Sequence, residues 1–214
     1  MGCKINTLVG ITTYNRADKL KRLIHELQDL DFIVVDDGSN YELFLPPSKL
    51  VKIPHQGKKG YWLTYKVLIN RLLNSNYNDF IILPDDVHTI DFARIAEYHS
   101  RYRDEYYTIN IINDSRSSCW SSPTPCKVES DMINKGFFDC GGLTNRKTLE
   151  LINLKPMRKS WWTEGKSSGV GYQITKQLKG KAKMLTPKKS LAYHGDHESV
   201  MHPQERINNP LLSV

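Results

Sequence analysis

Two stretches of the sequence decide the fold: Phe32-Ile33-Val34-Val35-Asp36-Asp37-Gly38-Ser39 and Phe80-Ile81-Ile82-Leu83-Pro84-Asp85-Asp86. Each opens with four apolar residues in a row, which is typical of a strand that is buried on both faces. Each then stops at a pair of aspartates, which are common turn residues. These stretches therefore predict two core strands of a parallel sheet, both followed by acidic turns.

Apolar residues at helical spacing separate the predicted strands. They recur over residues 20–27 before the first acidic strand and over residues 62–73 before the second. Strands that alternate with helices favour an α/β fold with helices on both faces of a mostly parallel sheet. The predicted strands are 8–11, 32–35, 50–53, 80–83 and 106–112, and the predicted helices are 20–27, 62–73, 92–99, 145–152 and 170–178.

Length and composition fit a single domain over residues 1–214. Of the 214 residues, 39% are hydrophobic and 25% are charged, which excludes disordered, collagen-like and coiled-coil chains. The apolar runs are only a few residues long, so we expect no membrane span. Thirty basic and 23 acidic side chains give a formal net charge of +7. This balance favours anionic partners such as nucleotides or nucleic acid, although a solvated surface rich in lysine gives it too.

Cysteine usage and the N-terminus indicate a cytoplasmic protein. The four cysteines have neither C-x-x-C nor zinc-finger spacing, and we expect them to be reduced. The N-terminus lacks the basic and then apolar pattern of a secretory signal.

The two aspartate pairs are expected to meet at one edge of the sheet. The C-terminal ends of parallel strands share an edge, and ligands of α/β sheets bind there. Adjacent carboxylates repel one another, and a divalent cation keeps both ionised. Hard oxygen ligands suit Mg²⁺ or Mn²⁺, which complete their coordination with substrate phosphates. The pattern predicts a phosphate ester or diphosphate substrate; the alternative is that both pairs only form turns.

Three motifs carry a resemblance to a known family. Residues 11–16 (Ile-Thr-Thr-Tyr-Asn-Arg), 34–39 and 82–87 resemble, in order and spacing, the N-terminal half of GT-A-fold nucleotide-sugar glycosyltransferases. They are most similar to the large inverting family of bacterial and viral sugar transferases. The resemblance covers about the first 90 residues and implies a nucleotide-sugar-binding half there and an acceptor-binding half over residues 91–214. Pro84 departs from the D-x-D pattern of the family, because it stands in place of the first acidic residue.

The resemblance implies roles for six residues of these motifs. A tyrosine ring can stack on a base, and a carboxylate can accept a hydrogen bond from a base or a ribose hydroxyl. By resemblance, the base is lined by Thr12 and Tyr14, the base or ribose is held by Asp36 or Asp37, and the metal is bound by Asp86 with Asp85 beside it.

Four further residues are candidates for the site. Lys59 belongs to a loop, residues 55–62, whose glycines and lysines can approach phosphate; a surface turn is the alternative. His194 matches the late histidine that the family often supplies to the metal or diphosphate, although a histidine-rich loop is also commonly just solvated. Glu164 and Asp139 match the position of the base that, in inverting relatives, takes the proton of the acceptor hydroxyl.

The sequence thus predicts a glycosyltransferase that depends on Mn²⁺ or Mg²⁺. The donor is a nucleoside-diphosphate sugar, with UDP favoured by its frequency in the family, and the acceptor is a hydroxyl of a glycan or glycoprotein. By analogy, the chain resembles the catalytic domains with which large DNA viruses glycosylate their capsid proteins. The alternatives are a retaining mechanism, a nucleic-acid-binding module, a DNA-modifying sugar transferase that uses the basic surface, or a non-catalytic carbohydrate-binding protein. A nucleotidyltransferase shares the broad architecture, but the Gly-rich, Arg-containing N-terminal loop expected of it is absent.

Overall fold

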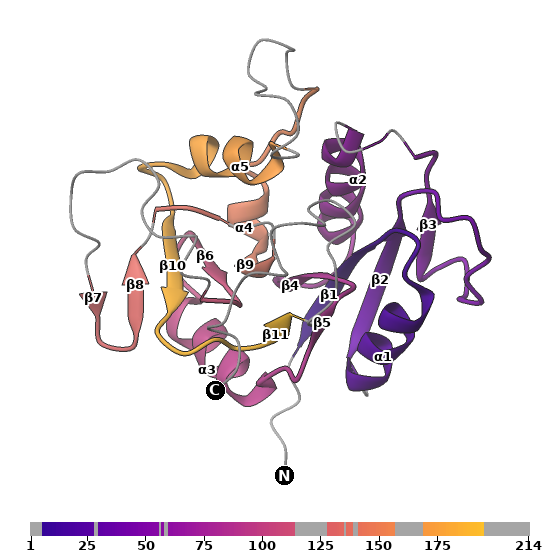
Figure 1. Ribbon diagram of the computed structural model, residues 1–214. Coiled ribbons are helices and arrows are strands. Elements are labelled where there is room, and N and C mark those ends of the chain that lie inside the picture. Colours follow the sequence, from indigo (N-terminus) through magenta and orange to yellow (C-terminus); the bar gives the residue numbers. More distant parts are fainter. Residues whose placement is uncertain are drawn as a thin grey trace, which may run out of the picture.

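The structure is a computed structural model that describes residues 6–27, 30–55, 57, 60–113, 128–134, 136–138, 141–156 and 169–194. Its strands are β1 (Thr7–Thr13), β2 (Asp31–Asp36), β3 (Leu50–Lys52), β4 (Asp79–Pro84), β5 (Val87–His88), β6 (Tyr107–Asn110), β7 (Val128–Glu129), β8 (Met132–Asn134), β9 (Gly142–Asn145), β10 (Lys183–Pro187) and β11 (Tyr193–His194). Within the described residues, nine strands form one sheet in the order β3-β2-β1-β4-β9-β6-β10-β8-β7 (Figure 1). The strands β11 and β5 form a separate two-stranded sheet.

Most strands of the large sheet run the same way. Strand β1 is parallel to β2 and β4, β2 is parallel to β3, and β6 is parallel to β10. Strand β9 is antiparallel to β4 and β6, and β8 is antiparallel to β10 and β7. Strands β9 and β8 therefore oppose the other seven of the nine, and the predicted mostly parallel α/β sheet is confirmed.

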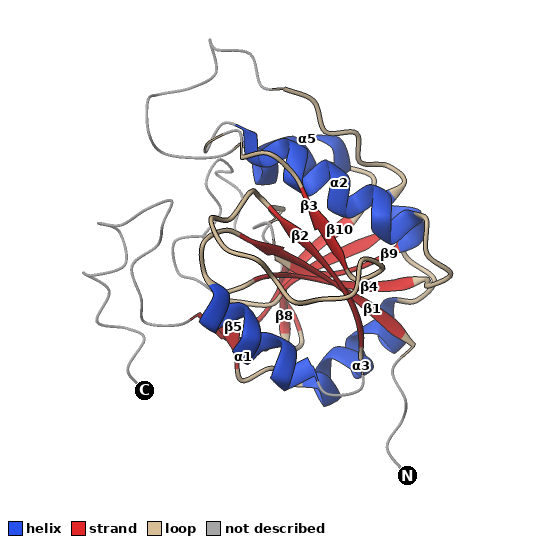
Figure 2. Cartoon of the chain, turned by 90° about the vertical axis from the view of Figure 1, so that its right-hand side faces the viewer, coloured by secondary structure: helices blue, strands red, loops and turns tan. Residues whose placement is uncertain are grey.

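Helices cover both faces of the sheet (Figure 2). One face carries α1 (Ala17–Leu27) and α3 (Phe92–Tyr102), and the other carries α2 (Tyr61–Leu73), α4 (Arg146–Leu149) and α5 (Val170–Leu178). Successive strand residues point to alternate faces, so Val34 and Ile81 lie in one hydrophobic cluster, while Val35 and Ile82 lie in the other. The core strands are apolar at successive positions because both faces are covered. None of the described helices is both long and apolar enough to cross a membrane.

The second half of the chain differs from the elements expected of it. Strands β9 and β10 and the β7–β8 hairpin were not predicted, and the helix expected at 145–152 is the single turn α4. Strand β9 begins at Gly142, where an added Cβ would lie 2.3 Å from the carbonyl oxygen of Ile109. Only glycine fits this close approach, and glycine weakens the sequence signal of a strand.

Candidate functional site

The turns after β1, β2 and β4 meet because these strands are neighbours in parallel register. Thr13, the last residue of β1, pairs with Asp36, the last residue of β2, and Thr12 pairs with the last residue of β4. The amide of Asp37 donates to the carbonyl of Thr13 (2.9 Å), and the amide of Asp85 donates to the carbonyl of Thr12 (3.2 Å). Both aspartate pairs therefore lie at the same edge of the sheet.

A single arginine nitrogen lies between the two carboxylates that follow β4. Nη1 of Arg16 donates to Oδ1 of Asp85 at 3.0 Å and to Oδ2 of Asp86 at 2.8 Å. Oδ2 of Asp85 also accepts a hydrogen bond from the hydroxyl of Thr13 at 2.8 Å. The two aspartates are only 3% and 4% exposed, and the side chain of Arg16 is 13% exposed. The centre of the site is thus a pair of buried carboxylates that face one cationic atom.

Burial controls the charge of this cluster. Burial raises the pKa of Asp85 to about 6, although Arg16 and the hydroxyl of Thr13 lower it, because a carboxylate away from water favours its neutral form. Burial also opposes the charge of Arg16, but the two carboxylates outweigh it and raise the pKa of Arg16. At pH 7 Asp85 is ionised at a cost in free energy, which a bound cation would reduce.

The loop after β2 fixes the backbone that carries Arg16. The amide of Arg16 donates to the hydroxyl of Tyr41 at 2.9 Å, and the amide of Asn15 donates to Oγ of Ser39 at 2.8 Å. Asn15 has a φ of +52°, a left-handed conformation that asparagine tolerates better than most residues. Its Oδ1 accepts from the amide of Asn40 at 2.8 Å, so the sharp turn after β1 is held in place.

Asp36 closes the turn after β2. Its Oδ1 accepts hydrogen bonds from the amide (2.9 Å) and the hydroxyl (2.6 Å) of Ser39. Its other carboxylate oxygen, Oδ2, is buried, makes no hydrogen bond with the described residues, and lies 4.0 Å from Nζ of Lys52. Oδ1 of Asp36 therefore holds the turn, while Oδ2 can still accept a hydrogen bond.

Asp37 is linked through a histidine to the ring of Tyr14. Its Oδ1 accepts from the hydroxyl of Thr64 at 2.9 Å, and its Oδ2 lies 3.0 Å from Nδ1 of His55. The imidazole of His55 stacks on Tyr14, with ring centroids 4.0 Å apart and planes inclined by 6°. Burial raises the pKa of Asp37, although Thr64 and His55 lower it. A stacking ring beside carboxylate acceptors is the combination that binds a nucleobase.

The small sheet brings the late part of the chain to the same edge. Strand β11 pairs with β5 so that His194 lies opposite Val87, the residue after Asp86. The side chain of His194 lies outside the described residues. Three other predicted residues lie outside them entirely: Lys59, Asp139 and Glu164. Among the side chains that the structure does describe, no group of three or more His, Cys, Asp or Glu could hold a metal ion.

Comparisons with known proteins give a fold. No family model and no curated protein matches the chain. The crystal structure of S. aureus TarS 1-349 matches with a TM-score of 0.59 and 14% identity, over 89% of this chain and 60% of that one. A second S. aureus TarS structure matches at 0.58 and 11% identity, over 88% of this chain and 36% of that one. A197 from STIV matches at 0.50 and 16% identity, over 88% and 85%.

These neighbours have the architecture of GT-A-type glycosyltransferases. The chain has a GT-A-like fold. At identities of 11% to 16%, the likeness shows a shared fold and nothing further. This chain spans 36% and 60% of the lengths of the two TarS structures.

The GT-A-like fold brings to the site four residues that the sequence analysis did not single out. Arg16 stands in one of the quoted motifs and His55 begins the loop before α2, so both were within reach of sequence reasoning. Thr64 lies on the buried face of α2, where a polar residue among apolar ones was the available signal. Tyr61 opens α2, and its hydroxyl lies 2.9 Å from Oγ1 of Thr12.

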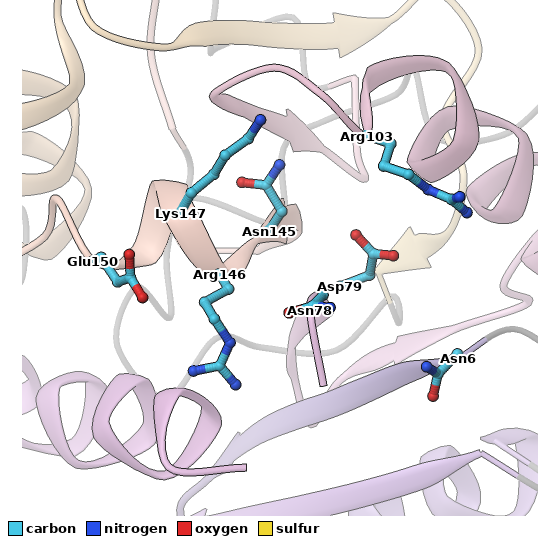
Figure 3. Close-up of a pocket in the computed structure, with 8 residues that line it drawn as sticks. All are labelled: Asn6, Asn78, Asp79, Arg103, Asn145, Arg146, Lys147 and Glu150. Carbon is cyan, nitrogen blue, oxygen red and sulfur yellow. The ribbon is translucent and has the colours of Figure 1, made fainter. Parts of the chain in front are cut away.

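A pocket of about 500 Å³ lies at the other edge of the GT-A-like sheet (Figure 3). Asp79, which lines it, is the first residue of β4, whereas Asp85 and Asp86 follow the last. The guanidinium of Arg146 donates to backbone carbonyls at the C-terminal end of α2 and in the turn that follows, and Asn145 caps α4. Because these polar groups already hold helix ends, we place the functional site at the aspartate edge. The lining residues are Asn6, Asn78, Asp79, Arg103, Asn145, Arg146, Lys147 and Glu150.

Proposed function

We propose that the protein is a glycosyltransferase that uses a nucleoside-diphosphate sugar and a divalent cation, Mn²⁺ or Mg²⁺. The observation that carries this proposal is the pair of buried carboxylates, Asp85 and Asp86, facing a single cationic atom after β4. Two such carboxylates at the C-terminal edge of parallel strands suit a metal-bound diphosphate. The GT-A-like fold supports the same class of reaction.

Asp86 and Asp85 are the proposed protein ligands of the cation, with His194 as a third. Mg²⁺ and Mn²⁺ take oxygen ligands and leave several positions to water and substrate phosphates, so two buried carboxylates fit them. Imidazole is a suitable further ligand for Mn²⁺. When bound, the cation neutralises the charge that develops on the leaving nucleoside diphosphate.

The turns after β1 and β2 are the proposed nucleoside site, with uridine favoured. Tyr14 is proposed to stack on the base with the face of its ring that His55 does not cover, and Thr12 lies at the same edge of the sheet. Asp36 or Asp37 accepts a hydrogen bond from the base or the ribose, and Asp36 has the oxygen with unused capacity. Lys59, in the loop before α2, adds positive charge for the diphosphate.

The acceptor is proposed to be a hydroxyl of a glycan or glycoprotein, bound by the part of the chain after residue 90. The hydroxyl must lose its proton as it attacks the sugar, so a base must contact it. Glu164 and Asp139 are the candidate catalytic residues for this step. Direct attack by the activated hydroxyl inverts the configuration of the sugar carbon.

Release of nucleoside diphosphate from a panel of sugar nucleotides tests the proposal. With Mn²⁺, the protein is expected to cleave one donor, and EDTA is expected to stop the reaction. Asp86→Asn keeps the shape of the side chain and removes its charge, and we expect it to abolish cleavage. The matched control is Asp104→Asn, at an exposed aspartate in the turn after α3, which is expected to leave the rate unchanged. Failure of the wild type to bind or cleave any donor with either cation contradicts the proposal.

The net charge of +7 favours a second candidate, a nucleic-acid-binding module or a DNA-modifying sugar transferase. Contacts with nucleic-acid phosphates make binding fall steeply as salt increases. Buried acidic pairs are a poor lining for a polyanion, which is why we place this candidate second. Salt-sensitive DNA binding without donor cleavage would favour the module, and donor cleavage stimulated by DNA would favour the DNA-modifying enzyme.

A further inference from the structure

The contact between Arg16 and the two aspartates has an unusual form. A guanidinium frequently binds a carboxylate through two parallel hydrogen bonds. Here one nitrogen, Nη1, contacts a different carboxylate on each side, at 3.0 Å for Asp85 and 2.8 Å for Asp86. Both aspartates therefore contact one positively charged atom, as they would contact a metal ion.

A divalent cation and Nη1 of Arg16 cannot share this position. Oxygen ligands lie about 2.1 Å from Mg²⁺. A cation bound to Oδ1 of Asp85 and Oδ2 of Asp86 would therefore fill the space of the nitrogen that already lies between these oxygens. Among these three side chains the charges favour the exchange, because a guanidinium brings one positive charge to the two ionised carboxylates and a divalent cation brings two.

The two ends of Arg16 are held differently. Its backbone amide is bound to Tyr41, and the preceding Asn15 is fixed by Ser39. The guanidinium, at the end of a flexible side chain, makes both of its hydrogen bonds within the described part of the chain with the two aspartates. If it leaves them, it pivots about a fixed backbone and stays at the same edge of the sheet.

We propose that Arg16 competes with the divalent cation for Asp85 and Asp86 and, once displaced, binds the diphosphate of the donor. This inference rests on the proposed function, from which it takes the cation and the donor. The guanidinium is well suited to a phosphate, with which it forms charge-assisted hydrogen bonds. Binding of the cation and of the diphosphate becomes cooperative, because the cation releases Arg16 and the diphosphate gives it a new partner.

Cation binding by an Arg16→Gln variant tests the competition. The electron paramagnetic resonance signal of free Mn²⁺ measures the affinity without any nucleotide. The variant is expected to bind Mn²⁺ about tenfold more tightly than the wild type, since a hydrogen bond to a charged group is worth about a factor of ten or more. The matched control is Arg22→Gln, at an exposed arginine of α1 that lies 3.9 Å from Glu26, and it is expected to leave the Mn²⁺ affinity unchanged.

Diphosphate binding supplies the second readout. Inorganic pyrophosphate is the probe, titrated by calorimetry at a saturating concentration of Mg²⁺. We expect Arg16→Gln to weaken its binding about tenfold, through loss of the charge-assisted contact. The two effects have opposite signs, whereas a purely structural role of Arg16 would weaken both. Equal or weaker Mn²⁺ binding by the variant overturns the inference, and so does unchanged pyrophosphate binding.

The outcomes separate this inference from the proposed function. If the wild type and Arg16→Gln bind Mn²⁺ equally and both cleave the donor, the role of Arg16 is wrong and the proposed function stands. If neither protein binds Mn²⁺ or Mg²⁺, both the inference and the proposed function are wrong. If the variant does not fold, a measurement on the wild type tests the inference instead. The ¹⁵N resonances of the Arg16 guanidinium are expected to move towards those of exposed arginines as Mg²⁺ is added, and no movement at saturation overturns the inference.

Discussion

Replacing Asp85 with asparagine is expected to stabilise the protein at neutral pH. The amide has nearly the shape of the carboxylate, and its oxygen can still accept the hydrogen bond from Arg16. On the other side, the hydroxyl of Thr13, which donates to Oδ2 of Asp85, can rotate and accept from the amide nitrogen instead. Asp85→Asn therefore removes a buried charge without leaving its neighbours unpaired.

The size of the effect follows from the raised pKa of Asp85. Burial moves this pKa from an ordinary value of 3.8 to about 6, so the folded protein holds the proton more tightly than the unfolded chain does. The wild type therefore gains stability as the pH falls through this range. A tenfold change in an ionisation constant is worth about 1.4 kcal/mol, so ionised Asp85 costs on the order of 3 kcal/mol at pH 7 and about 0.5 kcal/mol at pH 4.

Urea unfolding in the presence of EDTA measures this cost. Asp85→Asn is expected to be more stable than the wild type by about 3 kcal/mol at pH 7, with the difference shrinking towards pH 4. Asp104→Asn, the exposed control, is expected to show no such dependence. A variant that is less stable than the wild type at pH 7, or a difference that does not change with pH, would refute the reasoning. A confirmed result would mean that the chain keeps Asp85 ionised for a reason other than stability.

Three further changes test the packing. Burial lowers the pKa of His99 from 6.5 to about 4, so protonation favours the unfolded chain as the pH falls. Between pH 7 and pH 5 the wild type is expected to lose about 2 kcal/mol more stability than His99→Leu in urea unfolding, and equal losses would contradict this. Gly142→Ala is expected to cost about 1–3 kcal/mol, because its Cβ would meet a backbone oxygen, and more than Gly10→Ala, whose Cβ meets only side-chain atoms. Chemical unfolding of both variants decides the order. Arg146→Ala is expected to lower stability by about 2–3 kcal/mol, because it loses the hydrogen bonds to carbonyls at the end of α2 and in the turn that follows. Full recovery of stability in Arg146→Lys would show that the several donors of the guanidinium are not needed.

The first 90 residues were more predictable than the rest for a physical reason. Strands β2 and β4 are covered on both faces, so their apolar runs are unbroken, and α1 and α2 each bury one regular stripe. Strand β9 has only four residues, and it starts at a glycine that a close approach requires. Its position between β4 and β6 depends on contacts across the sheet, which no local pattern reveals.

The candidate site was also predictable only where a local sequence pattern marks it. That both aspartate pairs follow strands could be read from the chain, and the parallel sheet placed them at one edge. The contact between Arg16 and Asp85 joins residues 69 positions apart, and it exists because β1 lies beside β4. The pairing of His194 with Val87 likewise depends on β11 returning to β5. Motifs fix which residues stand at strand ends, whereas strand order decides which of those residues touch.

The place of β9 in the sheet limits how the chain can be divided. Strand β9 pairs with β4 from Asp79–Asn145 to Ile82–Gly142, so residues of the predicted acceptor half complete the edge of the predicted donor half. A fragment that ends near residue 90 would expose the apolar edge of β4, and such edges recruit other chains. The two halves are therefore separate in their proposed roles and inseparable in folding. A chimaera with a new acceptor preference would have to exchange loops and keep the pairing of β4 with β9 intact, because a cut between the halves would break the sheet.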